Sequence, residues 1–309
     1  MAAYATRRLL TLLAVAVLTP SATFVILTAL RDGTTLWAQA ARLPRYLSDT
    51  FLHLDLGVVG PPTQPQPIRD LVLDGLPVDL ALLVGGIVLG VAGGLGAGLL
   101  AGARPRGAVD RALGAGSALA ISMPVYWFAN VTLFVFAPGS GTFQIPFFSE
   151  TSGYVPPGRD PLGWLQAMWV PWVVLALPLG ALCYRMVRSA LADVVEEDVL
   201  RTARAKGLRE RLVLRRHALP LALPPVIGLV SANVALVITN IALIEHPFNL
   251  PGAFRFADIG QFRGEVGAHS PALDIVQALI VEAAFLVALA MLVCDVLLAW
   301  LDPRMREHG

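Results

Sequence analysis

Six long apolar runs divide the chain, and charged or proline-rich stretches separate them. A helix needs roughly 20 mainly apolar residues to cross the hydrocarbon core of a bilayer, and each run reaches that length. The predicted membrane-spanning helices cover residues 9–30, 80–103, 112–137, 161–184, 219–244 and 275–301. The pattern therefore predicts an all-α integral membrane protein in which residues 1–309 form a single transmembrane domain.

The second run contains a glycine at every fourth position. These residues, which we call the glycine stripe, are Gly86, Gly90, Gly94, Gly98 and Gly102. Small residues at this spacing let another helix approach closely, since helix association in lipid depends on packing rather than on hydrophobicity. We expect the stripe to be a packing seam, and its partner helix is not evident from the sequence.

The composition supports a membrane protein. The chain is 56% hydrophobic and 15% charged, whereas a soluble domain has about 25% charged residues. A net charge of +1 argues against nucleic acid as a partner. The histidines are scattered, and Cys183 and Cys294 both fall in apolar runs. We therefore expect no catalytic site and no metal centre.

The distribution of basic residues predicts the topology. Six spans place both termini on the same side of the membrane. That side, which includes the segment 185–216, carries sixteen of the 23 lysines and arginines, and the other side carries seven. Because basic residues accumulate on the cytoplasmic side, we predict cytoplasmic termini and a cytoplasmic loop over residues 188–218.

The most strongly charged stretch of the chain runs from Glu197 to Pro220. Among its long arginines, Ala203, Ala205 and Gly207 are small and would leave a notch that a partner surface can approach. A basic amphipathic segment can equally lie on anionic lipid headgroups. The residue pattern alone leaves both interpretations open.

Three of the polar residues within the predicted spans are candidate pathway residues. Asn233 and Asn240 are seven residues apart on one helical face, which could line a pathway or form hydrogen bonds to a neighbouring helix. Glu282 lies deep in the last span and could serve a pathway or gate, or form a structural pair.

The charged stretch also resembles a family signature. Arg201-Thr202-Ala203, Gly207 and Leu219-Pro220 have the spacing of the cytoplasmic EAA-x₃-G-x₉-I-x-LP signature of permease subunits of binding-protein-dependent ABC importers. Arg201 and Thr202 differ from the general triplet, but Arg201–Leu208 (RTARAKGL) is similar to the form usual in the dipeptide/oligopeptide/nickel branch. His217 takes the place of the isoleucine.

Further landmarks along the chain resemble the B-type permease of that branch. They are Arg7–Leu10, His53–Gly57, Leu76-Pro77, Ser122–Trp127, the set Glu245, Phe248, Pro251 and Gly252 (ExxFxxPG), and Leu301–Arg304. Ala253-Phe254 replaces the usual ending of the ExxFxxPGxG element.

The resemblance implies a type I ABC importer permease fold in the plasma membrane of a prokaryote. It implies a second, C-type permease, two cytoplasmic ATPases that bind ATP and Mg²⁺, and an extracytoplasmic solute-binding protein as partners. This chain would then be non-catalytic and bind no cofactor itself. The residues expected to couple to the ATPase are Glu197, Arg201, Thr202, Ala203, Arg204, Ala205, Lys206, Gly207, Leu208, Leu219 and Pro220.

The resemblance also suggests an outer-face contact with the binding protein through Glu245, Phe248, Pro251 and Gly252. Peptide is the expected substrate, with nickel, haem or another small solute as alternatives. A stand-alone secondary transporter is the competing function, although the chain shows no internal repeat of the kind such transporters often contain.

Overall fold

The structure is a computed structural model of the whole chain. It describes all residues except 1, 61–64, 103–105, 138–140, 144, 146, 149–153, 195–204, 206, 208–209, 214–215, 217–218, 258–270 and 302–309. The chain divides into two compact units. Unit 1 comprises residues 1–81 and 249–292, and unit 2 comprises residues 82–248 and 293–309.

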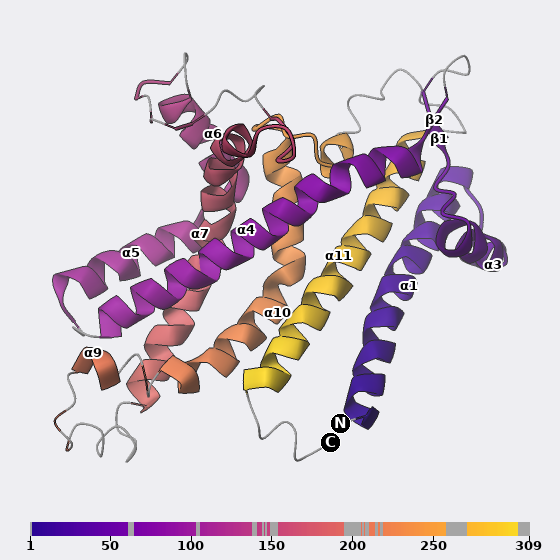
Figure 1. Cartoon of the computed structure of the whole chain (residues 1–309). Helices are drawn as coiled ribbons and strands as arrows, with labels where there is room; N and C mark the ends of the chain where they lie inside the picture. The colour runs from indigo at the N-terminus through magenta and orange to yellow at the C-terminus, as the bar shows by residue number, and fades with distance from the viewer. Residues whose placement is uncertain are drawn as a thin grey trace. The chain divides into compact units, whose positions relative to one another are not determined.

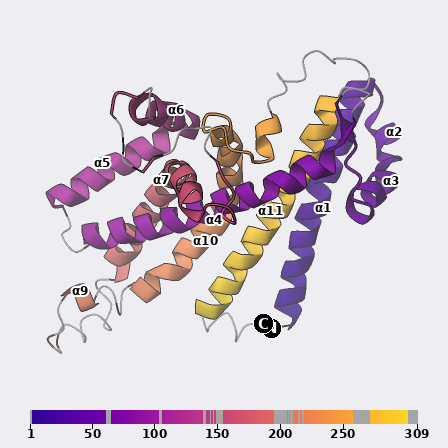
Figure 2. The same ribbon diagram turned by 45° about the horizontal axis from the view of Figure 1, so that its top comes forward.

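Unit 1 combines long apolar helices with a set of short elements that follow the first helix (Figure 1). Its elements are α1 (Ala2–Asp32), α2 (Leu36–Ala40), α3 (Leu43–Leu47), the π-helix η1 (Ser48–Leu52), β1 (Val58–Val59), β2 (Gln66–Pro67), the first part of α4 (Ile68–Gly102), the 3₁₀-helix η3 (Phe254–Ala257) and most of α11 (Pro271–Leu301). The two strands pair antiparallel, with Val58 opposite Pro67. Both views show α1 beside α11 (Figures 1 and 2).

Unit 2 is a helical bundle. Its elements are the rest of α4, α5 (Ala108–Ser122), α6 (Val125–Phe136), α7 (Pro161–Val194), α9 (Glu210–Val213), α10 (Leu219–Glu245) and the end of α11. Helix α7 packs against α5, α6 and α10. Its large apolar side chains, such as Met168 and Leu175, are almost completely buried. The core of unit 2 is therefore built around α7.

Five helices among the described residues are long and apolar enough to cross a membrane. They are Leu9–Asp32, Ile68–Gly102, Pro161–Leu191, Leu223–Glu245 and Leu273–Leu301. A sixth span is obtained if the bent pair formed by α5 and α6 counts as one. This agrees with the predicted number of spans, although α4 begins earlier and α7 ends later than the apolar runs do.

The predicted continuous helix over 112–137 is wrong. Helices α5 and α6 meet at an angle of 108°. Met123 and Pro124 between them are extended, with ψ angles of 135° and 137°. Proline has no backbone N–H to continue the helix, and it drives the preceding residue out of the helical region. Pro124 then begins a new helix in a different direction.

The glycine stripe of α4 packs against α7, which confirms the predicted seam and identifies its partner. A Cβ atom added to Gly86 would lie 2.6 Å from Leu175 Cδ2, and one added to Gly98 would lie 2.5 Å from Val187 Cγ1. These distances are shorter than real Cβ contacts, so a side chain at either position would require Leu175 or Val187, or the helix that carries it, to shift.

Candidate functional site

Most of the predicted coupling residues lie outside the described residues. These are Glu197, Arg201, Thr202, Ala203, Arg204, Lys206 and Leu208. Of the remainder, Ala205 is helical and exposed. Gly207 is also exposed and has a φ angle of +76°.

Gly207 occupies a backbone conformation that favours glycine. A residue with a Cβ atom is strained at a φ of this sign, and glycine with such a φ is a frequent end of a helical turn. A Cβ atom at Gly207 would have no described atom within 4 Å. Among the described residues nothing would collide with a side chain at Gly207, so the cost of a substitution there comes from the backbone conformation.

The Leu-Pro pair of the signature opens the next membrane helix. Leu219 and Pro220 are the first two residues of α10. Proline is tolerated in the first turn of a helix, since the N–H groups there have no partner within the helix. The pair therefore marks the point where the loop over 188–218 ends and the apolar helix begins.

An ionic network connects the start of α5 to the end of α7. The Asp110 carboxylate, which is 5% exposed, accepts hydrogen bonds from Arg188 Nε at 2.7 Å and Nη2 at 3.0 Å. It also accepts from the Arg106 backbone N–H at 2.9 Å and from the Tyr184 hydroxyl at 3.3 Å. This bidentate pairing fixes both position and orientation. One turn away, Arg185 Nε donates to the Ser117 hydroxyl at 3.3 Å.

The sequence analysis missed this network. Asp110 and Arg188 are 78 residues apart, and the arginine is one of many basic residues on the side predicted to be cytoplasmic. The sequence signal that could have indicated the network is Asp110, a single aspartate just before an apolar run that otherwise begins with basic residues. Because Arg188 lies six residues before the end of α7, the network lies next to the loop over 188–218.

The two asparagines of α10 lie in unit 2. Asn233 is half-buried, and its Nδ2 donates a hydrogen bond to the Leu229 carbonyl one turn earlier at 2.8 Å. Asn240 is 8% exposed. Their role in a pathway stays a prediction.

A buried acidic pair is present in unit 1. Glu282 is 4% exposed and lies close enough to Asp79, which is fully buried, for the two carboxyl groups to interact. Asp79 Oδ2 also accepts a hydrogen bond from the Ala253 backbone N–H at 3.0 Å. Neither carboxylate oxygen of Glu282 has a hydrogen-bond partner among the described residues. Its role as a pathway residue, a gate or a structural pair stays a prediction. Asp79, at the boundary of the predicted second span, was not recognised as a site residue.

The ExxFxxPG residues are largely buried. Glu245 and Phe248 in unit 2 are 0% and 3% exposed. In unit 1, Gly252 is buried and Pro251 is partly exposed. Their contact with a binding protein stays a prediction.

The segment that follows these residues packs closely on the first part of α4. A Cβ atom on Gly75 would lie 2.6 Å from Ala253 Cα. The Ala253 N–H is bonded to Asp79 on the same helix. Ala253 and Phe254, which replace the usual ending of the element, are 1% and 6% exposed, so they serve as core residues here.

The family model for inner membrane components of binding-protein-dependent transport systems matches residues 94–307. The chain belongs to this family. It is therefore a multi-pass inner membrane component of a transport system, and the resemblance to ABC importer permeases is confirmed.

Relatives support this assignment over most of the chain. The oligopeptide transport system permease protein OppB of Mycobacterium tuberculosis (strain ATCC 25618 / H37Rv) is 32% identical over 270 residues, which cover 85% of this chain and 80% of that protein. A peptide transport system permease protein of Brucella abortus (strain 2308) is 29% identical over 265 residues, which cover 86% and 79%.

A solved structure supports the fold. A chain of the inward-facing MetNI methionine ABC transporter matches 77% of this chain and all of its own length, with a TM-score of 0.53 and 20% identity. At this identity the likeness concerns the fold alone. The predicted ABC importer permease fold is confirmed.

Proposed function

We propose that the chain forms part of the membrane pore of an ATP-driven importer for peptides. A second permease subunit would complete the pore, and a solute-binding protein would deliver the substrate from outside. Two ATPase subunits would bind ATP and Mg²⁺, so this chain would be non-catalytic and bind no cofactor. The main support is the family match over residues 94–307, together with relatives that are named for peptide and oligopeptide transport.

The loop over 188–218 is the proposed contact with an ATPase. Its predicted coupling residues surround Gly207, whose exposed, left-handed backbone suits the end of a short helical turn. A short helix that ends in a sharp turn presents one compact surface to a partner. In this assignment the basic residues of the loop serve a protein partner rather than lipid headgroups.

Movement of this loop would pass into the membrane through α7. The Asp110–Arg188 pair and the Tyr184 hydroxyl hold the end of α7 to the start of α5. A displacement of the loop would then move both helices together, as rigid-body switching requires. Asn233, Asn240 and Glu282 remain the proposed pathway residues.

The test is ATP-driven uptake by the reconstituted transporter. The chain would be co-expressed with the second permease and the ATPases encoded beside it, purified as a complex, and placed in proteoliposomes. Uptake of a labelled peptide should require ATP and the cognate binding protein. Parallel arms with nickel and haem would identify the substrate class.

Two outcomes contradict the proposal. If the chain forms no complex with any co-expressed ATPase, the importer assignment fails. If the chain alone catalyses uptake driven by an ion gradient, it is a secondary transporter. Uptake of nickel or haem in place of peptide would keep the mechanism and correct the substrate.

A further inference from the structure

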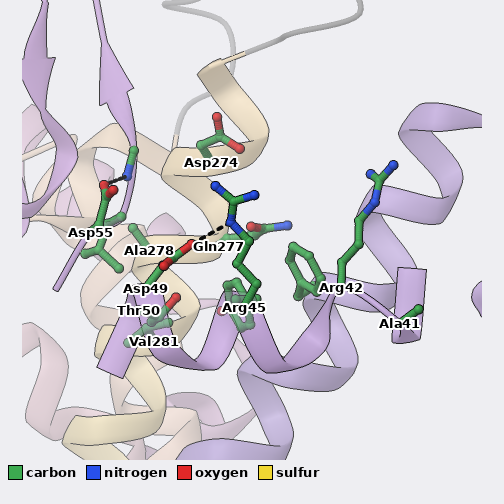
Figure 3. Close-up of a pocket in the computed structure, with 14 residues that line it drawn as sticks. Ala41, Arg42, Arg45, Asp49, Thr50, Asp55, Asp274, Gln277, Ala278 and Val281 are labelled. Carbon is green, nitrogen blue, oxygen red and sulfur yellow. Dashed lines mark hydrogen bonds and ion pairs between the residues drawn. The ribbon is translucent and has the colours of Figure 1, made fainter. Parts of the chain in front are cut away.

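A cavity of about 560 Å³ opens in unit 1 where α1 and α11 meet the short elements (Figure 3). It is lined by residues of α1, α3, η1, the segment 55–57 before β1, and the first turns of α11. Its size falls within the range of small-molecule sites, about 300–1,000 Å³. The predicted site residues that the structure describes do not line it.

The lining carries charges of both signs. We call Arg42 and Arg45 the cavity arginines, and Asp49, Asp55 and Asp274 the cavity carboxylates. The ion pairs formed by these groups are long: 3.4 Å between Arg42 and Asp32, 3.6 Å between Arg45 and Asp49, and 3.7 Å between Arg31 and Asp274. Close N–H···O contacts between charged groups measure about 2.7–2.9 Å. The cavity arginines can therefore turn toward a ligand without breaking a short ion pair.

Gln277 lies in the same cavity with an unused hydrogen-bond donor. Its side chain is 9% exposed, and its Nε2 has no hydrogen-bond partner among the described residues. Leaving a buried donor unpaired is unfavourable, because the group has lost its hydrogen bonds to water. The amide belongs to the lining of the cavity, and Figure 3 shows it near Arg45. A ligand with an acceptor would remove this cost.

Tyr46 gives the cavity a rigid wall. Its ring stacks on Phe24, with 4.2 Å between the ring centroids. Burial raises the pKa of the Tyr46 phenol, so the hydroxyl stays neutral near pH 7. The wall is therefore aromatic and brings no negative charge to the cavity.

We propose that this cavity binds a zwitterionic ligand, with an acidic group held by the cavity arginines and the Gln277 amide and an ammonium group held by the cavity carboxylates. A peptide with free termini is such a ligand, and to that extent the inference rests on the proposed function. The ethanolamine phospholipid headgroup carries the same two charges. Because the cavity lies at the ends of two membrane-spanning helices, the experiment includes both sources.

The test measures binding to the purified complete transporter in nanodiscs, without ATP or binding protein. Radiolabelled tri-alanine would be added to nanodiscs made of phosphatidylcholine alone, and phosphatidylethanolamine would be included in a second preparation. We expect saturable binding of tri-alanine, or its displacement by phosphatidylethanolamine. Tri-alanine blocked at both termini should bind at least tenfold more weakly, because it has lost both charges.

Two variants and one control test the residues. Gln277→Leu and Arg45→Gln should each weaken binding about tenfold. Arg69→Gln is the control, since Arg69 is an exposed arginine of the same unit that pairs with the adjacent Asp70 and does not line the cavity. It should bind as the unchanged protein does. Because the Arg45 side chain is 89% exposed, its replacement should leave folding intact even if Gln277→Leu does not.

The result that overturns the inference is equal binding of blocked and free tri-alanine, or unchanged binding in both variants. Absence of saturable binding, with no effect of phosphatidylethanolamine, overturns it as well. ATP-driven peptide uptake by the same preparation distinguishes failure of the cavity inference from failure of the proposed function. If peptide import occurs while the variants bind normally, the cavity inference fails and the importer assignment stands.

Discussion

Gly94 in the seam between α4 and α7 provides a sharp test of the packing. A Cβ atom there would lie against Cys183 Cβ, 2.7 Å from the Gly180 carbonyl oxygen and 3.0 Å from the Tyr184 backbone nitrogen. Two of these three contacts are backbone atoms, which no side-chain rotation can relieve. Ordinary contact begins at 3.4 Å, so the helices would separate by at least about 0.7 Å, the difference between 3.4 and 2.7 Å, because Cys183 Cβ lies closer still.

The loss of stability can be estimated from the dispersion contacts that this separation weakens. A radial gap of about 0.5–1 Å forfeits a quarter to a half of a dispersion contact, and overpacking typically costs about 1–3 kcal/mol. Helix propensity works the other way, since alanine is favoured over glycine by about 1 kcal/mol in a helix interior. The neighbouring Gly93 has no described atom within 4 Å of an added Cβ. Gly93→Ala therefore isolates the propensity gain.

The comparison of Gly94→Ala with Gly93→Ala cancels the propensity term. We expect Gly94→Ala to be less stable by about 1–3 kcal/mol, which corresponds to a fall in Tm of several degrees. A thiol-reactive fluorophore can follow thermal unfolding in detergent, because Cys183 and Cys294 are buried thiols that form no disulfide. If both variants unfold at the same temperature, α4 and α7 do not pack as described.

Three further predictions concern other contacts. Gly207→Val should reduce peptide uptake per ATP hydrolysed severalfold, and Gly207→Asn should reduce it less, because asparagine tolerates a positive φ. Gly33→Val is the control, since Gly33 also has a positive φ, of +62°. Equal effects of all three variants would contradict the coupling role of Gly207. Asp110→Asn should likewise lower the peptide uptake per ATP hydrolysed, and the double variant that exchanges Asp110 and Arg188 should restore part of it. If it does not, the network has only a structural role. Gly75→Ala should make the segment near Ala253 more sensitive to proteolysis, and unchanged cleavage would argue against that contact.

Local pattern predicted the spans and the seam but not the break at Pro124. Apolar periodicity reports which residues can face lipid, and it continues through the break. Proline alone does not signal a break either, because six prolines lie inside the long helices: Pro20, Pro77, Pro171, Pro178, Pro224 and Pro225. At Pro124, by contrast, the backbone turns. Whether a proline breaks a membrane helix or lies within it depends on the neighbouring helices rather than on the local sequence.

The acidic residues show the same limit. Asp79 and Asp110 each stand at the edge of an apolar run, where a charge is normal and suggests only a boundary. Their partners are distant in sequence: Asp79 is 174 residues from Ala253, and Asp110 is 78 residues from Arg188. These carboxylates are buried by tertiary contacts, which the spacing of residues within one helix does not predict.

Within unit 2, the contacts of α7 suggest why this helix suits the proposed coupling. Along the glycine stripe α7 meets α4 at backbone distance, and at its end Arg188 holds it to α5 through a bidentate pair. Close-packed interfaces of this kind have little freedom to deform continuously, so they move as blocks. A force applied to the loop over 188–218 would therefore displace α4, α5 and α7 together. If instead the loop moved while this block stayed fixed, the end of α7 would have to separate from Asp110, and substitution of Asp110 would then leave coupling unchanged.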